Sequence, residues 1–240
     1  MRTVIDLHTH TISSGHAFST FKENLEEGAR RGLLAFGTSD HASGMPGAAH
    51  PIFFDNYRVI PEEINGVKVF AGIEADIYDY KGTIDVETPT LKELDYVIAS
   101  LHSPCIKSGT AEENTNALIG AMKNPYVKII GHPDDSRYPL DYDRLVRAAR
   151  EYKVALELNN SSLRPRSTRL NGRLNARRLL EKCMQYEAMI IMGSDSHICY
   201  DVGRFTEACA LLDEVGFPEE LVINTSVENL SFVISRAFRS

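Results

Sequence analysis

The histidines of this 240-residue chain are concentrated at predicted strand ends, where side chains can converge. Seven of the eight histidines stand there, from the pair His8 and His10 to His197, which follows Asp195 by two residues. Alternate residues of a strand point to the same face, so each of these pairs must project into one space. Imidazoles and carboxylates that converge in this way are typical ligands of transition metals. The pattern predicts a polynuclear metal site.

Nine residues form the candidate ligand set, and we expect all of them at one rim of the fold. They are His8, His10, His16, His41, Glu74, His102, His132, Asp195 and His197. One zinc ion takes three or four protein ligands, so nine ligands require two or three metals, with Glu74 well placed to bridge. Zinc, iron or manganese suits such a set better than magnesium or calcium. A single histidine at a strand end is more often a hydrogen-bonded core residue, but nine convergent residues favour ligation.

Two acidic residues beside these ligands could assist them. Asp6 and Asp40 could orient imidazoles from behind, and a purely structural role for Asp6 fits its position in the first strand equally well. We take Asp40 as the candidate catalytic residue, because it could act as a general acid. His50 lies in a loop away from any predicted strand end, so we expect it to be a non-ligand.

Seven apolar runs alternate with amphipathic stretches and predict an α/β fold. The expected strands cover residues 4–8, 33–38, 67–77, 96–101, 127–131, 154–158 and 189–193. The expected helices cover residues 20–31, 111–123, 142–152, 175–186 and 204–215, with no long helix between the third and fourth strands. Most runs are apolar on both faces, as in a parallel sheet covered by helices. Seven repeats without a GxGxxG fingerprint favour a distorted, TIM-like (β/α)7 barrel over an open Rossmann sheet, with the active site at the C-terminal ends of the strands.

Composition sets limits on organisation and partners. No Pro/Gly/Ser-rich linker divides the chain, so we expect one domain over residues 1–240. The net charge of −7 disfavours non-specific binding to nucleic acids. No apolar run approaches the ~18 residues of a membrane span and the N-terminus has no leader pattern, which predicts a cytoplasmic protein. The four cysteines show no CxxC spacing, as expected for reduced thiols.

A basic loop follows the sixth predicted strand. The strand ends at Asn159 and Asn160, and four arginines follow within ten residues, at positions 164, 166, 169 and 173. On an acidic protein these arginines would form a local anion site, because the planar guanidinium suits bidentate contacts to phosphate. We take Asn159, Asn160, Arg164 and Arg166 as candidate substrate-binding residues. The alternative is a solvated basic loop.

The ordered motifs of the chain resemble those of the PHP (polymerase and histidinol phosphatase) superfamily. The matching segments are Asp-Leu-His8-Thr-His10, Ser-Asp40-His41, Gly-Ile-Glu74, His102, Gly-His132-Pro and Gly-Ser-Asp195-Ser-His197. The resemblance covers nearly the whole chain and is closest to the small, stand-alone YcdX-like phosphatases. It implies the PHP fold, a distorted (β/α)7 barrel, together with a trinuclear metal centre usually assigned as zinc and phosphoesterase activity.

The resemblance also implies how the ligands divide among three metals. His8, His10, Glu74 and Asp195 would hold the first metal, and His16, His41 and His197 the second. His102 and His132 would hold the third, with Glu74 as the bridging carboxylate. Zn²⁺ is the expected ion, and Mn²⁺ and Fe²⁺ are alternatives.

The chemistry of such a centre points to phosphate ester hydrolysis. Adjacent dications lower the pKa of a shared water, bind phosphate oxygens and offset charge as the ester bond breaks. We therefore expect a metal-dependent phosphoesterase that acts on a small phosphorylated metabolite, most simply a phosphomonoester. The alternatives are a histidinol-phosphate phosphatase, a nucleotide or short-oligonucleotide phosphoesterase, and a non-catalytic PHP module whose metals are structural. The sequence leaves open whether the protein is a homo-oligomer.

Overall fold

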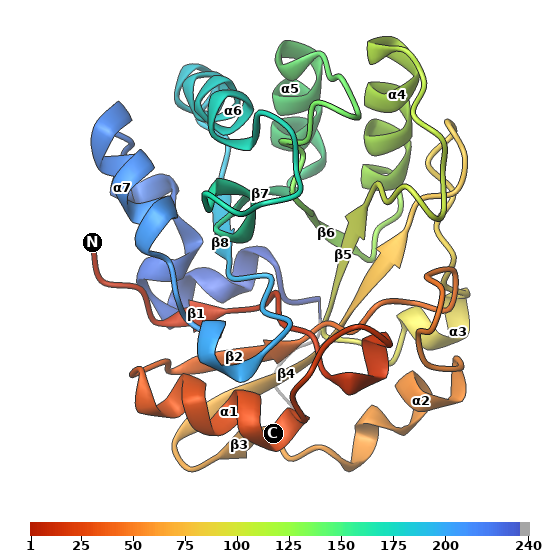
Figure 1. Ribbon diagram of the computed structural model, residues 1–240, viewed down its shortest axis with the longest axis vertical. Coiled ribbons are helices and arrows are strands. Elements are labelled where there is room, and N and C mark those ends of the chain that lie inside the picture. The colour runs from red at the N-terminus through yellow and green to blue at the C-terminus, as the bar shows by residue number, and fades with distance from the viewer. Residues whose placement is uncertain (236–240) are drawn as a thin grey trace.

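The computed structural model describes residues 1–235 and shows a nearly closed barrel of parallel strands (Figure 1). The barrel strands are, in order, β1 (Ile5–Asp6), β2 (Ala35–Thr38), β4 (Val67–Asp76), β5 (Tyr96–Ser100), β6 (Val127–Ile130), β7 (Ala155–Asn159) and β8 (Ile190–Gly193). Each pairs in parallel with the next one in this order. The seven predicted strands and the TIM-like barrel are therefore confirmed.

One strand was not predicted, the short β3 (Glu63–Ile64), which pairs antiparallel with β4. The turn between them is Asn65-Gly66, and both residues have positive φ, 52° and 78°. Asn-Gly is the typical sequence of a tight hairpin turn, because both positions require a left-handed backbone. The dipeptide was thus a usable signal for this hairpin.

Helices surround the strands as an outer ring (Figure 1). They are α1 (Phe21–Arg30), α2 (Ile52–Asp55), α3 (Thr88–Leu91), α4 (Ala111–Met122), α5 (Tyr142–Tyr152), α6 (Gly172–Tyr186) and α7 (Thr206–Val215). Short 3-10 helices are η1 (Ile12–Ser14), η2 (Asn56–Val59), η3 (Ser161–Leu163), η4 (Cys199–Asp201), η5 (Glu219–Leu221), η6 (Ile223–Thr225) and η7 (Val227–Phe232). Between β4 and β5 lies only the single turn of α3, as expected. Capping boxes start α1 at Thr20 and α4 at Thr110, so these two boundaries follow from local sequence.

The inward face of the barrel changes from apolar to polar along the strands. One buried cluster contains Ile5, Ala35, Phe70, Ile98, Ile129, Ala155 and Ile191, which come from seven different strands. Alternate residues of β4 share one face, so Glu74 and Asp76 lie on the same face as Phe70, nearer the C-terminal end of the strand. The apolar layer therefore forms a floor, and the polar layer above it lies at the C-terminal ends of the strands.

Asn224 of η6 closes the seam between β8 and β1. Its side-chain carbonyl accepts from the Met192 backbone N–H at 2.6 Å, and its amide donates to the Ile5 and Met192 carbonyls, each at 2.8 Å. The backbone carbonyl of Asn224 accepts from Val4 N–H at 2.9 Å. A direct bridge between Thr9 and Ser196 joins the two strand extensions nearer the polar layer. One buried asparagine thus replaces ladder hydrogen bonds that the two strands do not make to each other.

Residues 1–235 contain no helix that combines the length and the apolar character required to cross a membrane. The four cysteines all lie within these residues, and none of them is in a disulfide.

Candidate metal centre

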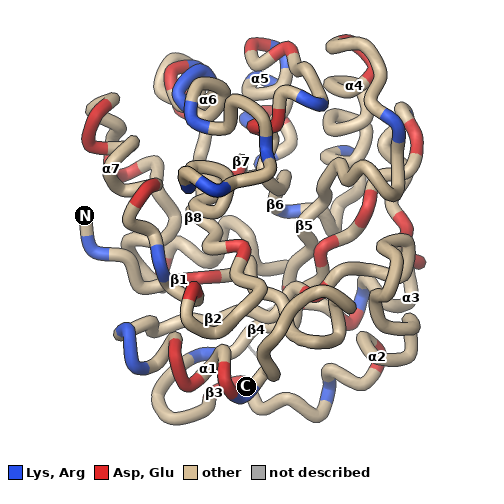
Figure 2. The backbone as a smooth tube through the Cα atoms, viewed as in Figure 1, with Lys and Arg blue, Asp and Glu red and all other residues tan. Residues whose placement is uncertain are grey.

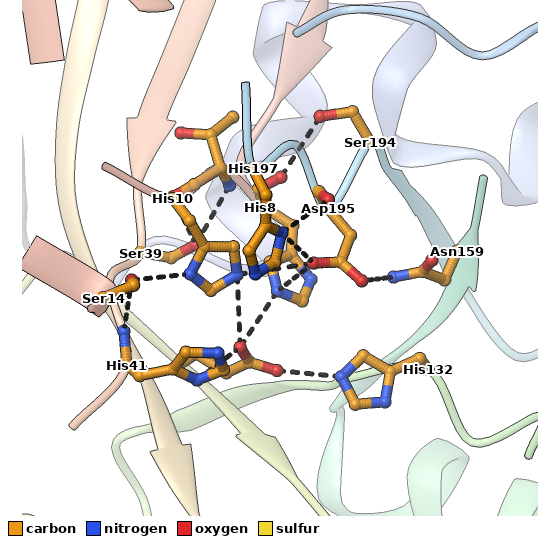
Figure 3. A network of polar contacts seen from close by, with 12 residues as sticks. His8, His10, Ser14, Ser39, His41, His132, Asn159, Ser194, Asp195 and His197 are labelled. Atoms are coloured by element: carbon orange, nitrogen blue, oxygen red, sulfur yellow. Dashed lines mark hydrogen bonds and ion pairs between the residues drawn. The ribbon is translucent and has the colours of Figure 1, made fainter. Parts of the chain in front are cut away.

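The structure brings all nine candidate ligands to the C-terminal end of the barrel. His8 and His10 follow β1, His41 follows β2, and Glu74 lies within β4. The others follow β5, β6 and β8, apart from His16, which lies in the loop after η1. Figure 3 shows most of these side chains pointing toward one another from different strands. Convergence from separate strands is what a barrel rim provides.

Glu74 lies at the centre of the cluster and faces five imidazoles. Its Oε2 lies 3.3 Å from Nε2 of His8, 3.3 Å from Nε2 of His10 and 3.0 Å from Nδ1 of His41. Its Oε1 lies 2.9 Å from Nε2 of His132 and 3.4 Å from Nε2 of His102. Burial alone would raise the pKa of Glu74, but the nearby imidazoles hold this pKa well below its ordinary value. An ionised carboxylate with two groups of nitrogen donors around it is suited to bridging metals.

Asp195 and His197 complete the other side of the cluster. Oδ1 of Asp195 lies 3.4 Å from Nε2 of His10 and 3.8 Å from Nε2 of His8. Nε2 of His197 lies 3.0 Å from Nε2 of His16, and the His41 ring stacks on that of His16 at 5.1 Å between centroids. Two imidazole nitrogens this close repel each other when both present lone pairs, so the pair is suited to sharing a cation.

Four buried polar atoms in the cluster face one another at 3.0–3.3 Å but make no hydrogen bond with each other or with the rest of the described residues. They are Nε2 of His8, Nε2 of His10, Nδ1 of His41 and Oε2 of Glu74. A buried polar atom without a partner costs about 1–3 kcal/mol, so four together would be expensive in a purely structural core. The donor set consists of imidazole nitrogens and carboxylate oxygens, which fits zinc and related transition metals.

Carboxylates, carbonyls and a hydroxyl hold the outer nitrogens of the imidazoles. Glu157 Oε1 lies 2.6 Å from Nδ1 of His8, and Asp76 Oδ1 lies 2.6 Å from Nδ1 of His102. Nδ1 of His16 and of His197 lie 3.0 Å and 3.1 Å from backbone carbonyl oxygens. A proton held on Nδ1 leaves the lone pair of Nε2 directed into the cluster. The side chains are therefore oriented for ligation by their surroundings.

Two of the candidate ligands are among the six residues other than glycine that have a positive φ in the described part of the chain. His132 has φ of 28° and Asp195 has φ of 50°, in the left-handed region that residues other than glycine rarely occupy. The strained backbones are held by hydrogen bonds from His132 N–H to Glu157 Oε2 at 2.7 Å and from Asp195 N–H to the His8 carbonyl at 2.9 Å. Gly193 makes room nearby, since a Cβ there would lie 1.8 Å from Glu157 Oε1. Such strain is typical of functional sites.

The two flanking aspartates, Asp6 and Asp40, accept hydrogen bonds from backbone N–H groups and hydroxyls, and neither of them lines the cavity. Asp6 accepts hydrogen bonds from the backbone N–H groups of His8, Ser194 and Gly203, at 3.3, 3.2 and 2.8 Å. Asp40 is fully buried and accepts from Thr11 and from Ser14 Oγ at 2.6 Å. Ser14 Oγ lies 2.9 Å from Nδ1 of His10, so Asp40 acts on that imidazole through the serine.

A cavity of about 470 Å³ opens onto the cluster. Its lining includes the ligand candidates His16, His41, Glu74, His102, His132, Asp195 and His197, together with Arg137, Arg166 and Arg169. His50 is not part of this lining; its Nδ1 accepts from Ile52 N–H at 3.3 Å, and its side chain is exposed. The volume falls within the range of sites for small molecules.

The predicted substrate-binding residues occupy different places. Arg166 lines the cavity, whereas Asn159 lies behind it and donates to Asp195 Oδ2 at 3.2 Å. Asn160 points to α7, where its carbonyl accepts from the backbone N–H groups of Glu207 and Ala208, each at 3.0 Å. Arg164 forms an ion pair with Asp201 at 2.5 Å, outside the cavity lining. Asn160 is thus held by α7, and Arg164 is held through Nη1 alone, since its Nε and Nη2 have no hydrogen-bond partner among the described residues. A contact of either residue with substrate stays a prediction.

Sequence reasoning missed three residues that shape the site. Glu157 and Asp76 hold ligand imidazoles, and Arg169 donates to Asp195 Oδ2 at 2.9 Å while lining the cavity. Asp76 stands two residues after Glu74, and Glu157 two residues before Asn159, so strand periodicity was an available signal for both. Arg169 was among the arginines of the basic loop, but nothing in the sequence singled it out.

Close relatives of the chain are named probable phosphatases. One from Caldanaerobacter subterraneus subsp. tengcongensis is 48% identical over 231 residues, covering 96% of this chain and 90% of the relative. Another from Acetivibrio thermocellus is 45% identical over 236 residues, covering 98% and 97%. The chain belongs to this family of probable phosphatases. No family model matches the sequence.

Solved structures with the same fold are consistent with this family. A histidinol phosphate phosphatase from Lactococcus lactis subsp. lactis, solved with zinc, L-histidinol and phosphate, has a TM-score of 0.62 at 19% identity, covering 90% of this chain and 95% of that one. A putative histidinol phosphatase from Listeria monocytogenes has a TM-score of 0.62 at 15% identity, covering 83% and 97%. At these identities the likeness shows the fold alone. The findings together support the PHP superfamily and confirm the predicted hydrolase acting on phosphoric esters, while the YcdX-like branch stays a prediction.

Proposed function

We propose that the protein is a zinc-dependent phosphomonoesterase of the YcdX-like branch that acts on a small phosphorylated metabolite. The observation that carries this proposal is the set of four buried donor atoms without hydrogen-bond partners beside a cavity. A structural core would satisfy these atoms within the protein. Family membership among probable phosphatases supports the same conclusion from independent evidence.

Three ions would be held by the nine candidate ligands. His8, His10, Glu74 and Asp195 would bind the first, and His16, His41 and His197 the second. His102, His132 and the second oxygen of Glu74 would bind the third. When bound, such ions supply hydroxide at neutral pH and offset negative charge on phosphate oxygens.

The chain's own residues orient the ligands and the substrate. Glu157 and Asp76 keep a proton on Nδ1 of His8 and His102, so both imidazoles present Nε2 inward. Arg169 reaches Asp195 from the cavity wall, where its guanidinium would contact an oxygen of the reacting phosphate. We assign Asp40 an orienting role, because both of its oxygens are buried and hydrogen bonded away from the cavity.

The proposed reaction is hydrolysis of a monoester. The oxygen of water bonds to phosphorus, the bond between phosphorus and the ester oxygen breaks, and the leaving alcohol takes up a proton. The cavity of about 470 Å³ accommodates a compact substrate rather than a polymer. The seven candidate ligands that line this accessible space favour an enzyme over a module with purely structural metals.

The experiment compares p-nitrophenyl phosphate with bis(p-nitrophenyl) phosphate, using zinc-loaded protein before and after chelation. We expect the monoester to be hydrolysed faster, activity to disappear on metal removal, and zinc to restore it. Equal rates before and after complete metal removal would contradict the proposal. Full metal loading without hydrolysis of either ester would instead indicate a structural metal module.

A further inference from the structure

The part of the cavity wall that lies outside the candidate metal ligands is both basic and apolar. The lining beyond the ligand candidates includes Arg137, Arg166, Leu101, Leu118, Tyr138 and Leu140. The apolar side chains would contact a short carbon skeleton. In Figure 2 basic residues mark the segment that leads from β7 into α6, which supplies Arg166. The wall therefore carries basic side chains in addition to the candidate metal ligands.

No carboxylate of the described cavity lining is free to bind a cation of the substrate. The lining has three carboxylates, Glu74, Asp135 and Asp195, and the first and last belong to the metal cluster. Asp135 Oδ1 accepts from the backbone N–H groups of Arg137 and Leu170, at 2.9 and 3.2 Å. Its Oδ2 accepts from Nε and Nη2 of Arg137, at 2.8 and 2.5 Å. An ammonium group of a substrate would therefore find no unpaired carboxylate in this lining.

The arginines differ in how far their charge is already balanced. Arg169 is bound to Asp195, and Arg137 is paired with Asp135 but keeps 44% of its side chain exposed. Arg166 is exposed and makes no ion pair or hydrogen bond with the rest of residues 1–235. A guanidinium without a carboxylate partner on a binding wall is suited to a planar or tetrahedral anion of the ligand.

We propose that the leaving alcohol of the natural substrate carries a second anionic group, a carboxylate or another phosphate, which Arg166 binds with help from Arg137. This inference rests on the proposed function, because it assumes that the reacting phosphate lies at the metal cluster. It ranks anionic leaving groups above neutral ones, and both above cationic ones such as histidinol.

The experiment measures kcat/KM of the zinc-loaded protein on four substrates with a three-carbon leaving group. They are 3-phosphoglycerate, 1,3-propanediol bisphosphate, glycerol 3-phosphate and 3-aminopropyl phosphate, whose leaving groups carry a carboxylate, a phosphate, no charge and an ammonium. We expect at least one anionic substrate to exceed the neutral one by about 10-fold or more, as one charge-assisted hydrogen bond allows. The better of the two anionic substrates distinguishes carboxylate from phosphate.

Two variants separate this subsite from the reacting phosphate. Arg166→Ala should remove the preference for an anionic leaving group while leaving glycerol 3-phosphate within about twofold, and Arg166→Glu should shift the preference toward 3-aminopropyl phosphate. Arg178→Ala, on the exposed face of α6, is the matched control and should leave all four values unchanged. An equal loss on all four substrates in Arg166→Ala would place this arginine at the reacting phosphate and overturn the inference.

Hydrolysis of p-nitrophenyl phosphate keeps the two proposals apart. If that hydrolysis is metal-dependent and the four substrates show no preference by charge, the subsite inference fails and the phosphomonoesterase remains. If no monoester is hydrolysed by fully loaded protein, the proposed function itself fails.

Discussion

Two polar regions of the barrel, the seam between β1 and β8 and the histidine cluster at the C-terminal rim, differ in how their buried polar atoms are hydrogen bonded. At the seam between β1 and β8, Asn224 is fully buried and both functional groups of its side chain have backbone partners at 2.6–2.8 Å. At the candidate metal centre, His8, His10 and Glu74 are equally buried, but each has an atom without a hydrogen-bond partner. The difference separates polar residues that complete the fold from polar residues that require a ligand.

The comparison also explains how the ligands are held in place. Three of the four unpartnered atoms belong to side chains in which another atom is hydrogen bonded, namely those of His8, His10 and Glu74. The protein thus fixes the direction of these three donors and leaves the inner atom of each without a hydrogen bond. Binding of cations would recover the cost of those atoms, so metal binding should stabilise the folded chain.

Glu74→Gln tests the candidate metal centre and should have the largest effect on activity. An amide bridges two cations poorly and carries no charge to balance them, so the variant should lose at least one metal and ~100-fold or more in kcat. The measurements are elemental analysis and kcat on p-nitrophenyl phosphate. His50→Ala is the matched control and should be nearly silent; wild-type activity in Glu74→Gln, or an equal loss in both variants, would break the distinction between ligand and bystander.

Asn224→Ala tests the seam. The change leaves the Met192 N–H and the Ile5 and Met192 carbonyls without their partner, which should lower the free energy of unfolding by about 3 kcal/mol. Denaturant unfolding of the metal-free protein measures this loss. Metal content of the folded variant should stay unchanged.

The control for the seam is Asn229→Ala in η7, whose amide makes longer contacts of 3.2–3.5 Å. It should cost much less than Asn224→Ala. Comparable losses in both variants would show that the seam asparagine has no special role in closing the barrel.

Glu157→Gln sharpens the comparison, because Glu157 belongs to the layer that orients a ligand without being one. Its oxygens contact Nδ1 of His8 and N–H of His132, and an amide nitrogen cannot accept from either donor. We expect metal affinity to fall about 10- to 100-fold, measured by competition with a chelator, with activity restored at high zinc. Glu207→Gln, which alters another carboxylate bonded to an asparagine, is the control; loss that excess zinc does not restore would assign Glu157 a different role.

The smallest expected effect concerns Asp85, which accepts from the backbone N–H groups of Gly44 and Asp76 at 2.7 and 2.8 Å. Burial and the neighbouring charge of Asp76 raise the pKa of Asp85 to about 6. An acid whose pKa is raised on folding binds its proton more tightly in the folded state. The free energy of unfolding therefore falls as pH rises from about 4 through the folded-state pKa, and it changes little above about pH 7.

The measurement is the free energy of unfolding of metal-free protein at pH 4, 5 and 6, compared with Asp85→Asn. The wild type should lose up to about 2 kcal/mol more than the variant over this range. Parallel pH profiles for the two proteins would contradict the assigned shift.

The barrel could be predicted from the sequence because strands and helices alternate with clear periodicity. Most of the nine candidate ligands could be named for the same reason, since they lie in or just after the C-terminal ends of strands, and the ends of parallel strands meet. The seam could not be predicted, because the contacts of Asn224 join residues more than thirty positions apart or at opposite ends of the chain. No local pattern reveals such contacts.

The directions of individual side chains were the second feature that the sequence could not predict. Asn159 and Asn160 are adjacent, yet one points to Asp195 and the other to α7, because β7 ends at Asn159 and Asn160 already has the helical backbone angles of the N-cap of η3. In the basic loop after β7 no periodicity applies, so the sequence could not distinguish Arg164, bound to Asp201, from Arg166 on the cavity wall.

The most direct test of the account is the number of metal ions that the protein binds. The measurement is elemental analysis of purified protein after reconstitution with zinc and removal of loosely bound metal, combined with the unfolding temperature of the same samples. The account predicts three zinc ions per chain and a higher unfolding temperature than that of the metal-free protein. One zinc ion or fewer per chain, or an unfolding temperature that zinc does not change, would contradict the claim that the unpartnered atoms at the barrel rim form a polynuclear metal centre.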